Sequence, residues 1–453
     1  MPDYKEYLDI WNFILLPVYL IIIFLVSNRI KNKHINDNPV YKYYTAGLFI
    51  KITGGILFTL IYIFYYKCGD TLNYFSGGRA LVNLLFKHTY PCLSILFGNT
   101  TVENWSYFDV TTGWPMWSMY FLKPDSFAVM RLITPFLLIS FNKFLLCTII
   151  LDWVAYAGIW RFYLMLCEIY PKITKQFAIA VFCIPSLIFW GSGIMKDTFT
   201  FAATLWFTYN TYMIFIKKSK IPVNIIVLII NFWILIILKP YILVALLPNV
   251  LVWVLFKQIK SIKNKVLRYL SAPALLVIGI IICTSSFSIF SKELGAYSSV
   301  DSAIKKAQVT QQDLIRDQYG TNSFNIGNFD NSFSSIVSKA PAAIIAGLFR
   351  PFIWEVHSVT MLISGIENFI FLILFIYFIF YIGLLKVFKF IIQDPLLIFF
   401  CSFILIFSFS VGLTTANFGA LVRLKIPATV FFAVFLFILY QKNKEFKQFR
   451  KIP

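Results

Sequence analysis

Charged side chains and histidines are scarce in this chain. Only 13% of its 453 residues are charged, three are histidine, and 59% are hydrophobic. A soluble domain cannot bury that much apolar surface, so lipid must act as part of the solvent. The scarcity of charge excludes an ordinary soluble enzyme and predicts an all-α polytopic membrane protein.

Several motifs of catalysis and metal binding are also missing. No CxxC, Walker A, GxSxG or HExxH pattern occurs, and the histidines are scattered. These absences exclude a P-loop ATPase and leave no predicted metal site or cofactor. A divalent metal stays open, because the loop acids Glu103 and Asp109 could join Asp70.

Seven cysteines are present, most of them inside apolar runs. Cys68 and Cys92 lie in a connection instead. They either form a disulfide, if that connection faces an oxidising compartment, or remain two free thiols.

The formal net charge of +20 comes from short clusters of Lys and Arg between apolar runs. This is the positive-inside pattern of membrane proteins. No groove of interleaved basic and aromatic residues is visible, so nucleic acid is not an expected partner.

Eleven apolar runs are long enough to predict membrane spans. They lie near 9–27, 45–66, 143–166, 174–191, 198–216, 222–238, 241–256, 267–286, 360–385, 395–413 and 425–440. The first is interpreted as a retained span and not as a signal peptide. The dense basic clusters fall on alternate connections, which predicts an outer N-terminus and a cytoplasmic C-terminus.

We expect one integral membrane domain, 1–453, with two long outer loops at 67–142 and 287–359. The run 127–140 is too short to span and predicts an interfacial or re-entrant helix. In the second loop, the polar sequence of residues 298–320 predicts a solvated helix. We also expect a weakly apolar helix that ends at Phe349.

The stretch YYKCGDTLNYFSGGRALV places Asp70 where a hydrophobic span ends, just before an amphipathic helix. Burial would raise the pKa of such a carboxyl, and nearby cations would lower it. We therefore expect Asp70 to act as a general base. The alternative is a residue that merely opens a turn.

Other charged residues map to the short outer turns, which should carry little positive charge. Their presence predicts an anion bound at the outer leaflet. Arg350 and Arg423 suit this role because guanidinium makes paired bonds to phosphate. Gly191, Ser192 and Gly193 leave backbone N–H groups above a helix N-terminus, a common phosphate seat.

Alternatives remain for several of these positions. Asp197 is either a helix cap or a site residue. Lys239 and Lys425 either contact the ligand or extend to the interface. Arg423 either binds phosphate or pairs with Glu355.

Two charges fall inside predicted spans. Asp152 either carries protons, as in a transporter, or pairs with Lys51 or with a tyrosine.

Three segments resemble type-C glycosyltransferases, the superfamily of protein mannosyltransferases and lipid A aminoarabinose transferases. They are GDTLNYFSGGRALVNLL, FWGSGIMKDTFTFAATLWF and LVRLKIPATVFFAVF. In addition, LFRPFIWE resembles bacterial polysaccharide-assembly membrane proteins. Thr71 stands where many members have a second acid, and Leu424 where they have tyrosine, so a repeat-unit polymerase is the competing interpretation.

The resemblance implies transfer of a sugar, with inversion, from a polyprenyl phosphate or diphosphate to an acceptor hydroxyl of a glycan or protein. It also implies a bacterial inner membrane with a site facing the periplasm. The expected catalytic residues are Asp70, Asp197 and Glu355. The expected phosphate-binding residues are Lys196, Arg350, Arg423, Lys239 and Arg79, and the expected substrate-binding residues are Tyr74, Trp114 and Trp117.

Three rival functions stay open. A repeat-unit polymerase or oligosaccharide ligase would use the same face and the same cations. A transporter of lipid-linked substrates would need polar residues through the bilayer. A scaffold of an envelope complex would need no general base.

Overall fold

The computed structural model of the chain describes residues 6–286, 323–327 and 332–449, with single positions between 305 and 312. Among these residues no strand occurs, and one isolated bridge joins Ser323 and Asn417. Seven of the described helices are long and apolar enough to cross a membrane. The chain is therefore an all-helical polytopic membrane protein, as its composition predicts.

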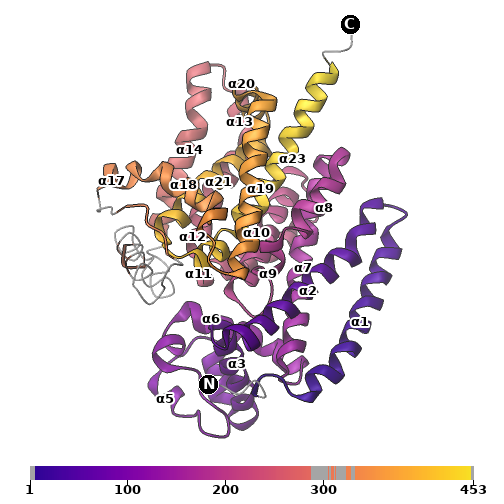
Figure 1. Cartoon of the computed structure of the whole chain (residues 1–453), viewed down its shortest axis with the longest axis vertical. Helices are drawn as coiled ribbons and strands as arrows, with labels where there is room; N and C mark the ends of the chain where they lie inside the picture. The colour runs from indigo at the N-terminus through magenta and orange to yellow at the C-terminus, as the bar shows by residue number, and fades with distance from the viewer. Residues whose placement is uncertain are drawn as a thin grey trace. The chain divides into compact units, whose positions relative to one another are not determined.

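The described elements are shown in Figure 1. In chain order they are α1 (Ile10–His34), η2 (Pro39–Tyr43), α2 (Tyr44–Leu60), η3 (Ile61–Tyr66), α3 (Asp70–Lys87), α4 (Thr89–Leu96), α5 (Val102–Trp105), η4 (Trp117–Phe121), α6 (Pro124–Ile139), α7 (Phe144–Ile169), η5 (Pro171–Ile173), α8 (Thr174–Phe182), α9 (Pro185–Phe189), α10 (Lys196–Thr211), η6 (Tyr212–Ile216), α11 (Ile221–Leu238), α12 (Pro240–Val254), α13 (Phe256–Ser261), α14 (Lys265–Ser286), α17 (Phe333–Ser338), α18 (Ala340–Phe349), η10 (Ile353–Glu355), α19 (Val359–Ile382), α20 (Leu384–Gln393), α21 (Pro395–Thr414), α22 (Phe418–Leu424) and α23 (Ile426–Phe449). The segments η3, η4 and η6 are π-helical.

The seven candidate spans coincide with seven of the eleven expected ones. They are Ile10–His34, Pro39–Tyr66, Phe144–Ile169, Ile221–Leu238, Met361–Ile382, Pro395–Thr414 and Ile426–Gln448. The other four expected runs are helical too, as α8 with α9, α10 with η6, α12, and α14. The run 174–191 is broken because Pro185, which lacks a backbone N–H, begins a new helix. The run 241–256 forms only the 15 residues of α12.

The chain divides into two compact units. Unit 1 consists of Met1–Leu164, Ile188–Trp206 and Trp233–Lys239. Unit 2 consists of Met165–Leu187, Phe207–Phe232 and Pro240–Pro453. Each unit is described by itself below.

In unit 1, α1 and α2 form an antiparallel pair (Figure 1). Large apolar side chains of α1, such as Phe13 and Leu25, are exposed, which is typical of a helix that faces lipid. The helix expected after Asp70 is α3, and the short helix expected at 127–140 is α6. These two helices pack closely through Gly77 and Gly78, where an added Cβ would come within 3 Å of α6 side chains.

A tight turn separates α2 from α3. Lys67 ends η3 in the left-handed conformation, with φ of 55°. Gly69 follows with φ of 129°, and a Cβ there would lie 2.6 Å from the Tyr62 ring. Only glycine adopts this conformation without strain. The turn makes Asp70 the first residue of α3, where a negative charge complements the helix dipole.

In unit 2, α18 packs against α21. A Cβ at Gly412 would lie 2.0 Å from the Ala343 carbonyl oxygen, and one at Gly347 would lie 2.2 Å from that of Ser408. Helix α18 is the weakly apolar helix expected to end at Phe349. The solvated helix expected at 298–320 lies, apart from single positions, outside the described residues.

We predict that Gly412→Val lowers the free energy of unfolding by about 2 kcal/mol or more, because the obstructing atoms are backbone and cannot turn aside. Thermal unfolding in detergent micelles measures this. Leu405→Ala, on an exposed face of the same helix, is the control and should change stability by less than about 0.5 kcal/mol. Equal unfolding temperatures for Gly412→Val and the unaltered protein would contradict the close packing.

Candidate functional site

Asp70 lies in a polar cluster of unit 1. The Tyr120 hydroxyl donates to Asp70 Oδ1 at 2.9 Å, and the Asn73 amide donates to the Tyr120 oxygen at 3.0 Å. Asp70 and Asn73 come from the first turn of α3, and Tyr120 comes from η4. The half-buried Asp70 carboxylate is therefore oriented by a phenol from a distant part of the chain.

The start of α10 contributes to the same unit. Lys196 Nζ donates to Asp125 Oδ2 at 2.7 Å and to Ser126 Oγ at 3.0 Å. Ser126 also forms a hydrogen bond with the Tyr74 side chain, and the negative charge of Asp70 raises the pKa of Tyr74. Tyr74 thus links the Asp70 group to the Lys196 group.

The third component is a buried ion pair. Lys239 Nζ lies 2.5 Å from Asp197 Oδ1, and both side chains are less than 10% exposed. Asp197 is the second residue of α10 and not its cap, and Lys239 reaches this carboxylate instead of extending to an interface. We refer to the residues of these three groups together as the Asp70 cluster.

The two phenols of the Asp70 cluster stay protonated at physiological pH. Burial raises the pKa of Tyr74 and of Tyr120 well above the ordinary value, and the charge of Asp70 raises both further. Each phenol can therefore donate a hydrogen bond to a carboxylate.

The charges of the cluster nearly balance. Two ammonium groups, Lys196 and Lys239, lie with three carboxylates, Asp70, Asp125 and Asp197, which gives a formal charge of −1. The two lysines expected to bind phosphate therefore each hold a carboxylate here. Lys196 has three N–H donors and uses two of them on residues that the structure describes, so one donor remains for a ligand.

Arg79 does not join this cluster. It lies nine residues beyond Asp70, which is about 13 Å along α3. Its guanidinium donates to the backbone oxygen and side chain of Glu6, at 3.1 and 3.2 Å. This exposed ion pair accounts for Arg79 without a ligand.

The two tryptophans expected to bind substrate belong to the loop before α6. The Trp117 ring stacks on Phe121, and Trp105 packs edge-on against Trp117 at 4.9 Å. Trp114 donates through its indole nitrogen to the Phe108 carbonyl at 2.9 Å and keeps half its surface exposed. Trp117 is thus part of the packing, and Trp114 presents a free ring face.

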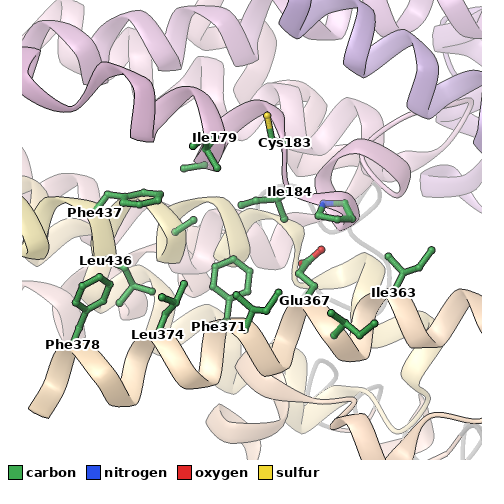
Figure 2. Close-up of a pocket in the computed structure, with 15 residues that line it drawn as sticks. Ile179, Cys183, Ile184, Ile363, Glu367, Phe371, Leu374, Phe378, Leu436 and Phe437 are labelled. Carbon is green, nitrogen blue, oxygen red and sulfur yellow. The ribbon is translucent and has the colours of Figure 1, made fainter.

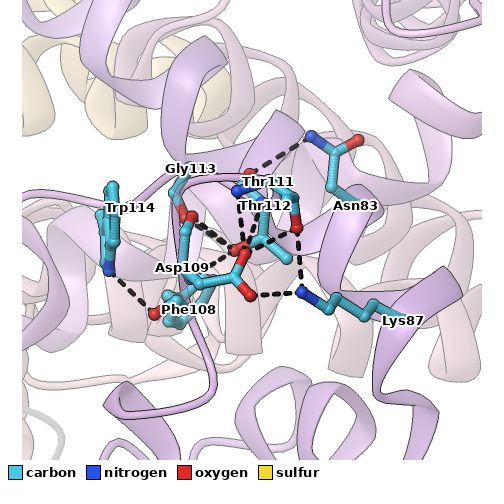
Figure 3. Close-up of polar contacts among 8 residues, drawn as sticks. All are labelled: Asn83, Lys87, Phe108, Asp109, Thr111, Thr112, Gly113 and Trp114. Carbon is cyan, nitrogen blue, oxygen red and sulfur yellow. Dashed lines mark hydrogen bonds and ion pairs between the residues drawn. The ribbon is translucent and has the colours of Figure 1, made fainter.

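A network of hydrogen bonds and an ion pair around the Asp109 carboxylate holds this loop in place (Figure 3). The carboxylate binds Lys87 of α3 and accepts from the backbone N–H groups of Thr111 and Thr112. Hydrogen bonding to Lys87 holds the pKa of Asp109 well below its usual range. Both carboxylate oxygens of Asp109 therefore have partners in Lys87 and the loop.

Unit 2 holds the expected arginines. Arg350 Nη2 lies 2.8 Å from Glu355 Oε1, and its guanidinium lies over the Phe324 ring. Glu355 is thus paired with Arg350, whereas a pair with Arg423 was one expectation. Arg423 lies in the last turn of α22. The cluster and these arginines belong to different units, so their predicted convergence stays a prediction.

Lys425 has a structural role in unit 2. Its ammonium, which is buried, donates to the backbone oxygens of Leu348 and Arg350 and to the Asn368 side chain at 2.6 Å. Two of its three donors are used at the end of α18 and the third on α19, so none is left for a phosphate.

Unit 2 also contains an apolar pocket of about 430 Å³ (Figure 2). It is lined by α8, α9, α19 and α23, and its walls are aliphatic and aromatic, including Phe371, Phe378 and Phe437. One carboxylate, Glu367, enters its lining and accepts from the backbone N–H and the hydroxyl of Ser186. The pocket therefore suits a hydrocarbon chain.

Among the described residues, no group of three or more His, Cys, Asp or Glu side chains could hold a metal ion. Cys68 and Cys92 are separate thiols. Cys92 is fully buried and donates to the Leu81 carbonyl.

Sequence reasoning missed four members of the cluster: Asn73, Tyr120, Asp125 and Ser126. Asp125 follows a proline at the start of α6, which is an ordinary helix opening and carries no signal of its own. Asn73 lies in the same turn of α3 as Asp70, whereas the other three come from η4 and α6, which pack on each other and, through α6, against α3.

Comparisons of the chain with protein-family models, with curated proteins and with solved structures found no match.

We predict that, at pH 8 in a Cys183→Ser background, maleimide modifies Cys68 rapidly and Cys92 only after denaturation. Burial raises the pKa of Cys92 to about 11 and removes the sulfur from solvent, so about one thiol in a thousand is ionised. Mass spectrometry of labelled peptides measures this. Equal labelling of both residues in the folded protein, or no labelling of Cys68 without reductant, would contradict the two separate thiols.

Proposed function

We propose that this protein is a membrane glycosyltransferase that moves a sugar from a polyprenyl phosphate or diphosphate to an acceptor hydroxyl. The observation that carries the proposal is the Asp70 cluster, in which a carboxylate held by Tyr120 lies in one unit with Lys196 and a buried ion pair. This combination supplies a base and a cation outside the candidate spans.

Asp70 is the proposed general base. The acceptor hydroxyl gives its proton to the carboxylate as its oxygen attacks the anomeric carbon, and the bond from that carbon to the carrier phosphate breaks with inversion. Tyr120 keeps Asp70 oriented for this proton transfer, and Tyr74 lies close to the same carboxylate. A positioned base of this kind contributes roughly 10²–10⁴-fold in rate.

Lys196 is the proposed contact to the departing phosphate. Its third N–H donor can bind a phosphate oxygen while Asp125 and Ser126 hold the ammonium in place. A preorganised cation stabilises the charge that develops on the leaving group. Arg350 and Arg423 remain further proposed phosphate contacts, and Glu355 and Asp197 serve to hold Arg350 and Lys239.

The apolar pocket supports a lipid-linked substrate. Its lining of aliphatic and aromatic side chains among candidate spans fits an isoprenoid chain better than a water-soluble ligand. We also propose the full topology of eleven spans, with the 67–142 loop on the periplasmic face of a bacterial inner membrane. The alternation of basic clusters supports this orientation.

We predict that Asp70→Asn lowers kcat by roughly 10²–10⁴-fold, because asparagine keeps the shape but cannot take the proton. The assay is transfer by purified protein in lipid nanodiscs from defined polyprenyl-phosphate and polyprenyl-diphosphate sugars. Asp37→Asn, the same chemical change at an exposed position of unit 1 outside the Asp70 cluster, is the matched control and should retain kcat.

Full activity of Asp70→Asn would overturn the assigned base. Products one sugar longer support the proposal, whereas ladders or transferred blocks would identify a polymerase or ligase instead.

We predict that a membrane-impermeant maleimide labels Thr111→Cys in intact cells and labels Lys218→Cys only after permeabilisation. Thr111 lies in the proposed outer loop, and Lys218 in a basic connection. Both substitutions are made in a background that lacks the native reactive cysteines. Labelling of the two positions from the same side would refute the proposed topology.

A further inference from the structure

Two charged residues face each other inside candidate spans of unit 1. Lys51 of α2 and Asp152 of α7 bring Nζ and Oδ1 to 3.5 Å, and their side chains are 5% and 0% exposed. Charges inside spans are costly and are functional candidates by default. The pair lies outside the Asp70 cluster, so the proposed mechanism leaves it without a role.

Both residues bind the turn 191–195, which precedes α10. Lys51 Nζ donates to the Gly191 carbonyl and to Ser192 Oγ. The Gly193 backbone N–H donates to Asp152 Oδ1 at 3.2 Å. The ion pair thus fastens three consecutive residues of the turn.

The glycines Gly54 and Gly55 of α2 make this arrangement possible. A Cβ at Gly55 would lie 1.8 Å from Asp152 Oδ2, and one at Gly54 would lie 2.1 Å from the Ile188 carbonyl oxygen. Even one methyl group at either position would displace the carboxylate or α9, the helix just before the turn.

The turn leads directly to the Asp70 cluster. The Gly193 carbonyl accepts from Thr198 in the first turn of α10 at 2.7 Å. Lys196 and Asp197, which lie between these two residues, make the ion pairs with Asp125 and Lys239. A shift of the turn would therefore move both ion pairs.

We propose that Lys51 and Asp152 are positioning residues, which hold the turn 191–195 so that Lys196 and Asp197 meet their partners in the Asp70 cluster. The kinetic part of this inference rests on the proposed glycosyltransferase function, whereas its structural part does not. Two of the backbone N–H groups expected to form a phosphate seat have partners within the protein: the Gly193 N–H donates to Asp152, and the Ser192 N–H donates to the Phe189 carbonyl at 3.3 Å.

The test compares Lys51→Met, Asp152→Asn, the double variant of both, and Gly55→Ala. Asp394→Asn is the matched control, because Asp394 forms a largely buried ion pair with Lys442 in unit 2. Two measurements are made in lipid nanodiscs: hydrogen exchange of peptides covering 188–198, and kcat with KM for sugar transfer.

We expect faster exchange of 188–198 in all four variants and unchanged exchange there in Asp394→Asn. Misplacement of the cluster should lower kcat by roughly 10²-fold, while KM changes less. The double variant removes the uncompensated charge, so its thermal stability should recover relative to the single variants. Its kcat should stay low, because the two hydrogen bonds from Lys51 to Gly191 and Ser192 are still missing.

Recovery of both stability and kcat in the double variant would show that the pair is only structural and would overturn the inference. Unchanged exchange of 188–198 in every variant would overturn it as well. If the unaltered protein transfers no sugar but the variants still loosen 188–198, the proposed function fails and the positioning role stands.

Discussion

A medium of low dielectric constant forces buried charges to find partners, and three buried lysines show how this constraint organises the chain. Lys51 pairs with Asp152, and Lys239 pairs with Asp197. Lys425 satisfies its donors with backbone carbonyls and an amide instead. Each lysine connects helices or turns that are distant in sequence. Apolar helix surfaces alone would allow neighbouring helices to slide or rotate against each other. These lysine contacts select one alignment.

The sequence predicted the helices well, because apolar length is a direct consequence of bilayer thickness. It also predicted Asp70 at the end of a span with an amphipathic helix after it. In the structure that helix begins at Asp70 itself, because Gly69 provides the turn and an acid is favoured in the first turn of a helix. Asp70, Lys196 and Lys239 lie in one unit for a related reason. Residues at the ends of neighbouring spans lie at similar depths in the membrane. Their position along the chain therefore predicts that they lie at the same membrane surface.

The choice of partner could not be predicted from the sequence. Arg79 forms an ion pair with Glu6, and Arg350 forms one with Glu355. Two cations that were expected to bind a ligand therefore have carboxylate partners within the protein. Tyr120 lies 50 residues from Asp70 in the chain, and its hydroxyl reaches the carboxylate because η4 packs against α6, which in turn packs against α3. Such contacts depend on side-chain direction and helix register, which the periodicity of apolar residues does not specify.

The π-helical segment η3 ends the helix that precedes Asp70. A π turn contains one residue more than an α turn but completes nearly the same rotation and rise. Loss of a single residue in Ile61–Tyr66 would therefore convert it to an α turn and leave the start of α3 in nearly the same orientation. Loss of one residue from the α-helical part of α2 would instead rotate everything that follows by about 100° and retract it by about 1.5 Å. The segment is thus the place in this helix where the chain can change its length by one residue and still keep the Asp70 carboxylate aligned.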